Sequence, residues 1–119
     1  DREEALRQAR EGDTVVVRHG PWRVDVFVPT IPFYEAAQRR VRTETFRGRP
    51  VPFLDAETLS VFKLLFFRSK DLVDIEKLVA VQGSDLDHAY VRRWMVDMMG
   101  DDDARVREWD RIVAEHGPR

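Results

Sequence analysis

The hydrophobic pattern of this chain changes at residue 55, and this change restricts the fold more than any other feature. Before it, short β-branched or aromatic runs alternate with polar residues; after it, apolar residues recur three or four positions apart. Alternation is typical of strands, and the longer period is typical of amphipathic helices. The 119 residues suffice for one domain. We therefore expect an α+β fold with two parts that together form one compact unit. The α/β part, 1–54, contains a small mixed or antiparallel sheet, and the helical part, 55–119, packs on it.

Turn and capping residues divide the two parts into elements. Gly20-Pro21 joins two β-branched runs as a hairpin, Pro32 suits the first turn of a helix, and Asp55 is a good helix N-cap. In the α/β part we expect helices over 1–11 and 31–40, strands over 14–19, 22–28, 41–46 and 51–54, and a turn over 47–50. In the C-terminal four-helix segment we expect helices over 56–68 and 71–81, one capped by Ser84 or Asp85, and one over 103–116.

The apolar faces of three of these helices define the expected core. The helix after Asp55 has an apolar stripe of Leu59, Phe62, Leu65 and Phe66. The helix before Gly100 is expected to turn inward Ala89, Val91, Trp94, Met95 and Met98. The last helix carries Val106, Trp109, Ile112 and Val113, which either close the bundle or form the face of a homodimer.

Composition excludes several classes of protein. The absence of cysteine excludes a disulfide framework, a thiolate metal site and a cysteine nucleophile. No apolar run approaches the roughly 20 residues of a membrane-spanning helix, so we expect a cytoplasmic protein with no membrane partner. Lys63, Lys70 and Lys77 are the three lysines among 20 basic residues, which leaves 17 arginines. This excess indicates either phosphate recognition by guanidinium groups or the codon bias of the genome.

Charged residues gather where the first two expected helices of the C-terminal segment meet. Lys63, Arg68 and Lys70 precede Asp71 and Asp74, with apolar residues between them. Basic residues at a helix C-terminus and acids at a helix N-terminus both suit the helix dipole, so one interpretation is capping alone. That interpretation explains Lys63 less well, because Lys63 lies at least a turn inside its helix. The alternative is that Lys63 contacts a phosphate.

These residues also carry a resemblance to a known family. The segment DAETLSVFKLLFFRSKDLVDIEKLV (55–79), with Val24-Asp25-Val26 before it and LDHAYVRRWM (86–95) after it, resembles the nucleotidyltransferase toxins of the abortive-infection (AbiEii) type. These toxins belong to the DNA-polymerase-β-like superfamily. The resemblance covers roughly residues 13–100. It implies a magnesium-dependent toxin of a toxin–antitoxin system, which transfers a nucleotide from a nucleoside triphosphate to an RNA (for example tRNA) or protein acceptor.

The resemblance implies a role for each matching residue. Two-metal chemistry of this kind needs carboxylates for the metal ions and cations around the phosphates. Asp25 would be a ligand of Mg²⁺, and the catalytic residues would be Lys63, Asp71 and Asp74. Phosphate or substrate binding would fall to Arg68, Lys70, Arg39 and Arg42. The implied partners are a nucleoside triphosphate, the acceptor RNA and an antitoxin.

One departure from the family pattern points to an alternative function. The family has a Gly-Ser pair and an Asp-x-Asp strand before the third carboxylate, and residues 1–24 contain neither. Because the chain opens at Asp1 without methionine, we expect these elements to precede it in a longer protein, and we expect this chain alone to be inactive. The alternative is a non-catalytic RNA- or protein-binding module that uses the arginines of the 39–49 stretch.

Aromatic residues near that stretch allow two interpretations. Trp22, Phe33, Tyr34 and Phe46 either stack on bases while arginines hold phosphates or pack in the core of the α/β part. We expect core packing for all of them except Tyr34.

Overall fold

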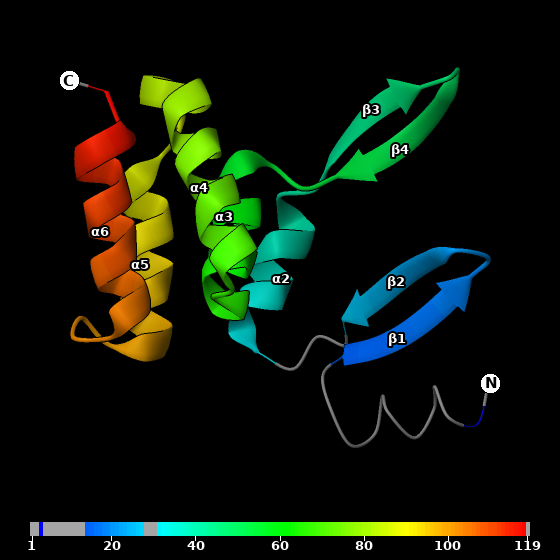
Figure 1. Cartoon of the computed structure of the whole chain (residues 1–119). Coiled ribbons are helices and arrows are strands. Elements are labelled where there is room, and N and C mark those ends of the chain that lie inside the picture. Colours follow the sequence, from blue (N-terminus) through cyan, green and yellow to red (C-terminus); the bar gives the residue numbers. More distant parts are fainter. Residues whose placement is uncertain (1–2, 4–13, 28–30, 119) are drawn as a thin grey trace. The chain divides into compact units, whose positions relative to one another are not determined.

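The computed structural model describes residues 3, 14–27 and 31–118 (Figure 1). Its backbone contacts divide the chain into two units, Asp1–Arg39 and Arg40–Arg119. The fold is α+β, as expected, but the second hairpin belongs to the same unit as the helical segment. The sequence pattern placed that boundary at 54 instead. No helix in the described ranges has the length and apolar character needed to cross a membrane.

The first unit contains the expected hairpin and the expected helix. Strands β1 (Thr14–His19) and β2 (Trp22–Phe27) pair antiparallel, from Thr14 opposite Phe27 to His19 opposite Trp22. Gly20 has a φ of +58°, which glycine adopts at little cost. Helix α2 (Pro32–Arg39) has its proline in the first turn, and Phe33 is buried as predicted. The helix predicted over 1–11 lies outside the described residues, apart from residue 3, which is helical.

The second hairpin forms a sheet of its own. Strands β3 (Arg42–Phe46) and β4 (Arg49–Phe53) pair antiparallel, and the described strands form two separate two-stranded sheets. The expectation of one small sheet is therefore wrong. Pro50 and Pro52 supply the physical reason, because they lie opposite Thr45 and Thr43, at pairs that do not exchange ladder bonds. Their missing N–H groups would face outward, so the outer edge of β4 presents few donors to a further strand.

The turn between β3 and β4 is shorter than the sequence predicted. Arg47 and Gly48 have φ of +51° and +77°, as a two-residue type I′ turn requires at both central positions. Arg49 and Pro50, which were expected in the turn, lie in β4. Asparagine or glycine normally occupies the first position of such a turn. Arg47 is therefore held in a conformation that its side chain disfavours.

Four helices form the rest of the second unit, as expected. They are α3 (Ala56–Phe66), α4 (Ser69–Gln82), α5 (His88–Met99) and α6 (Ala104–His116), with a 3₁₀ turn, η1 (Gly83–Asp85), after α4. Helix α3 packs on α4 and α5, and α6 packs on the same two helices (Figure 1). Asp87 caps α5 by accepting a hydrogen bond from the Tyr90 N–H at 3.1 Å. The expectation of a cap at Ser84 or Asp85 is wrong, because η1 occupies that stretch.

The buried face of α3 differs from the expected stripe. Thr58, Val61 and Leu64 are completely buried, whereas Leu59, Phe62 and Leu65 are half-buried and Phe66 is exposed. Because α3 contacts three other helices, most of its circumference is apolar, and periodicity alone could not identify the innermost face. Ser60 is tolerated inside because its hydroxyl donates to the Ala56 carbonyl at 2.8 Å.

The last two helices complete the core of the bundle. Val91 and Met95 of α5 are buried, and Trp94 and Met98 are half-buried, but Ala89 is exposed, contrary to expectation. On α6 the buried residues are Val106, Trp109 and Ile112. These three side chains close the bundle, so the alternative in which they form a dimer face is not needed.

Candidate functional site

The predicted lysine–aspartate cluster is present at the junction of α3 and α4. Lys63 Nζ lies 2.8 Å from Asp74 Oδ2 and 3.8 Å from Asp71 Oδ1. The Arg68 guanidinium donates to both oxygens of Asp71, at 2.7 and 3.2 Å, and the Arg68 N–H donates to Oδ2 at 3.1 Å. Lys63 and Arg68 are therefore both paired with carboxylates. The sequence placed these four residues correctly, and the structure brings them together.

Asp71 is the centre of the cluster, and its carboxylate is completely buried. Burial acts to raise the pKa of Asp71, but the hydrogen bonds from Arg68 and the charges of Arg68 and Lys63 outweigh it and lower the pKa. The hydrogen bond from Lys63 and its charge likewise lower the pKa of Asp74. Both acids are therefore ionised at neutral pH. This arrangement neutralises the cluster and caps the first turn of α4, as the capping interpretation predicts.

The other predicted site residues lie elsewhere. Lys70 is exposed on the first turn of α4, and Arg42 is exposed on β3. Arg39 ends α2, and Asp25 lies opposite Val16 in the first unit, with a carboxylate that lies outside the described side chains. Among the described residues, no three acids or histidines gather as a metal ion would require. Asp71 and Asp74 are both paired with cations, and Asp25, the Mg²⁺ ligand that the resemblance implied, has a side chain outside the described ones.

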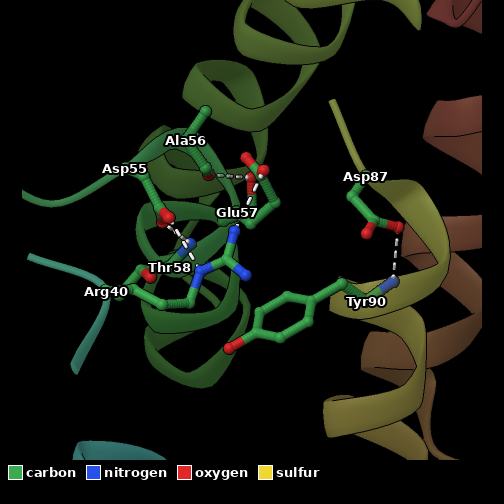
Figure 2. Close-up of polar contacts among 8 residues, drawn as sticks. Arg40, Asp55, Ala56, Glu57, Thr58, Asp87 and Tyr90 are labelled. Carbon is green, nitrogen blue, oxygen red and sulfur yellow. Dashed lines mark hydrogen bonds and ion pairs between the residues drawn. The ribbon is translucent and has the colours of Figure 1, made fainter. Parts of the chain in front are cut away.

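A second ionic cluster, which the sequence did not predict, lies at the start of α3 in the second unit. Figure 2 shows the Arg40 guanidinium between two carboxylates: Nε lies 2.7 Å from Asp55 Oδ2 and Nη2 lies 3.2 Å from Glu57 Oε1. The Tyr90 ring lies 4.1 Å from the guanidinium carbon. Asp55 also caps α3, accepting the Thr58 N–H at 2.8 Å, as predicted. This cluster ties the start of α3 to α5 and to the residue before the second hairpin.

The second hairpin presents one charged and aromatic face and one neutral face. By register, the first face carries Arg42, Glu44 and Phe46 of β3 and Arg49, Val51 and Phe53 of β4. The opposite face carries Thr43, Thr45, Pro50 and Pro52. Phe46 is 58% exposed and Phe53 is 45% exposed. The expectation that Phe46 packs in a core is wrong, and so is that expectation for Trp22, which is 70% exposed.

In the part of the chain that the structure describes, the arginines of this hairpin form no ion pairs, and they lie on the same element as two exposed phenylalanine rings. Arg93 of α5 and Arg107 of α6 are also exposed and form no ion pair within the described residues, so the combination with the exposed rings is what distinguishes the hairpin. In the described part of the second unit, Arg40, Arg68, Arg92, Arg105 and Arg111 form ion pairs with acids. Within the same described residues, Arg42, Arg47 and Arg49 form none, and all three are exposed. Arg47 contacts the Phe46 ring at 5.4 Å. The alternation of residues 41–46 located this element, but it could not show that the face would stay uncovered.

Comparison with models of known protein families, with curated proteins and with solved structures finds no match to this sequence. Function is therefore inferred from the residues and their geometry alone.

Proposed function

We propose that this chain is a non-catalytic module that binds single-stranded RNA through the charged face of the β3–β4 hairpin. The observation that carries the proposal is the set of three exposed arginines without acidic partners, interleaved with two exposed phenylalanine rings. Cations that track a backbone and aromatic rings that stack on bases are the two components of sequence-tolerant single-strand binding. The Arg42–Phe53 pair and the Phe46–Arg49 pair lie four strand residues apart, which is about 13 Å. Each pair offers one ring and one guanidinium.

The proposal is supported by the contrast between the hairpin and the lysine–aspartate cluster. A phosphate that approached Lys63 would have to displace Asp74 at 2.8 Å and Asp71 at 3.8 Å. A phosphate that approached Arg47 or Arg49 would displace only water. The net charge of the chain is −2, so attraction to RNA has to come from a local surface. The hairpin supplies one, with three arginines against Glu44.

Fluorescence anisotropy with a labelled single-stranded RNA of mixed sequence tests the proposal. Binding should weaken as salt rises, with a slope of log K against log salt of about −2, because about three phosphates are contacted. The double variant Arg47→Gln/Arg49→Gln should lose most of this affinity and most of the slope. Its matched control is Arg93→Gln/Arg107→Gln, which makes the same charge change on exposed residues of α5 and α6.

Two results would overturn the proposal. One is no RNA binding at low salt; the other is an equal loss of affinity in the hairpin variant and the helix control. If the partner is a protein and not RNA, the native chain would not change the anisotropy of the labelled RNA. The variant Arg47→Gln/Arg49→Gln would then abolish the complex with that protein.

Nucleotidyl transfer, with Mg²⁺, a nucleoside triphosphate, a tRNA acceptor and an antitoxin, stays a prediction from the resemblance. Its support is the order of Lys63, Asp71 and Asp74 along the chain, which the structure brings within one cluster. Calorimetry with ATP, with and without Mg²⁺, separates the two functions. Magnesium-dependent ATP binding that Lys63→Ala removes would support transfer. RNA binding without it supports the module that we propose.

A further inference from the structure

A cleft of about 440 Å³ opens at the base of the β3–β4 hairpin. It is lined by the hairpin, the start of α3 and the turn η1 after α4, all in the second unit. The volume lies within the range of small-molecule sites in proteins. The face of the hairpin that lines it is the charged one, through Arg42, Glu44 and Phe53. The proposed RNA path therefore leads from the tip of the hairpin into this cleft.

The polar groups of the cleft divide into satisfied and unsatisfied ones. Asp55 and Glu57 line it, but Arg40 holds both carboxylates. Glu44 and Asp85 also line it, and within the described residues neither side chain forms a hydrogen bond or an ion pair. Arg42 is likewise unpaired, and the Phe53 ring is 45% exposed. The cleft thus offers free carboxylates, one free guanidinium and one aromatic face.

This combination selects among the four bases. An ionised carboxylate only accepts hydrogen bonds, through two oxygens side by side. Guanine alone presents two adjacent donors, N1–H and N2–H₂, on its Watson–Crick edge. Adenine and cytosine place a ring nitrogen acceptor next to their amino group, and uracil flanks its single N–H with two carbonyls. Base edges and stacked rings are how proteins recognise single-stranded RNA.

We propose that this cleft binds a guanine base of the RNA strand, an inference that rests on the proposed RNA-binding function. Glu44 accepts the N1–H and N2–H₂ groups of the base, and the Phe53 ring stacks on it. Arg42, which lies opposite Phe53 in the register, contacts the adjoining phosphate. Glu44 is chosen over Asp85 because it shares the hairpin face with both of these residues.

The test compares U₈ RNA with U₈ that carries one central G, A, C or inosine, by anisotropy at fixed salt. A good bidentate contact is worth at least about 1 kcal/mol, so the G strand should bind about 5-fold or more tightly than the others. Inosine lacks the N2 amino group and should fall between G and A. Glu44→Gln should abolish the G preference, whereas U₈ should still bind, slightly more tightly because a negative charge is lost from the hairpin face. Asp101→Asn, an exposed acid between α5 and α6, is the matched control.

Failure of this inference is distinguishable from failure of the RNA-binding proposal. If all five strands bind equally and salt-dependently, RNA binding holds and the guanine site is wrong. If no strand binds, titration with GMP and AMP decides, because a guanine site requires saturable GMP binding that Glu44→Gln removes and that AMP does not show. Spermidine binding that Glu44→Gln abolishes, without any GMP binding, would identify a cation site and overturn the assignment.

Discussion

Asp71→Asn should destabilise the helical segment substantially, because Asp71 is the hub of the α3–α4 junction. Its carboxylate is buried and accepts three hydrogen bonds from Arg68, with Lys63 at 3.8 Å. Asparagine fills the same volume, but it removes the charge and turns an NH₂ group toward these donors. Hydrogen bonds to charged groups contribute roughly 1.5–3 kcal/mol each. The Arg68 side chain is half-exposed and can bind water again, so we expect a loss of about 2–3 kcal/mol.

Urea denaturation followed by circular dichroism at 222 nm measures that loss. The thermal midpoint should fall by about 10–20 °C, since 1 kcal/mol shifts a domain of this size by roughly 4–8 °C. The matched control is Asp74→Asn, which also removes a partner of Lys63 but whose carboxylate is 47% exposed. An exposed pair of this kind contributes roughly 0–1 kcal/mol. An equal loss in the two variants would refute the argument from burial.

The dependence of the effect on pH gives a second check. The pKa of Asp71 is lowered in the folded chain from 3.8, so ionisation of Asp71 favours folding above the unfolded pKa. That contribution disappears as pH falls through the lower, folded pKa. The gap between the native protein and Asp71→Asn should therefore be constant from pH 7 to about 5 and should narrow below about 4. A gap that stays the same at pH 3 would mean that the charge of Asp71 is not what stabilises the junction.

Three further predictions concern the fold. Trp109→Ala removes the largest fully buried side chain and should cost about 3–5 kcal/mol, seen as a loss of the cooperative unfolding transition at 37 °C. Asp87→Ala should cost about 1 kcal/mol through the lost cap of α5, whereas Asp85→Ala should be neutral in the same denaturation assay. Arg47→Asn should stabilise the hairpin by about 1 kcal/mol by relieving its positive φ, measured as slower amide exchange in β3 and β4, while it weakens RNA binding.

The sequence was sufficient to predict the structural features that are determined by residues close together in the chain. The β1–β2 hairpin, the Asp55 cap and the meeting of Lys63 with Asp71 and Asp74 all follow from local patterns, and the structure contains them. The sequence did not identify Asp87 as the cap of α5, because the turn η1 lies between α4 and α5. Ser84, Asp85 and Asp87 are all suitable cap residues, and the sequence alone does not distinguish among them. Caps are local, but the choice between adjacent ones depends on where the preceding helix ends.

Exposure of a strand face could not be predicted, because alternation shows which residues share a face and not whether another layer covers it. Phe46 therefore looked like a core residue until its strand proved to form a two-stranded sheet with β4 alone. Which residues of α3 lie innermost was ambiguous for the related reason that α3 contacts three helices. In both cases the missing information is tertiary: the number of neighbours that an element has, and on which sides.

The hairpin also departs from local rules in ways that point to function. At the first central position of a type I′ turn, where Arg47 lies, natural proteins usually have asparagine or glycine. Large aromatic side chains such as Phe46 and Phe53 are usually buried. Such departures from local preference tend to mark functional positions. Most arginines on the helical bundle have acidic partners, which stabilises the bundle, whereas those on the hairpin have none within the described residues. Arg47 is held at positive φ and contacts the Phe46 ring, but it has no acidic partner within the described residues. Contact with an anionic partner is the role that we propose for it.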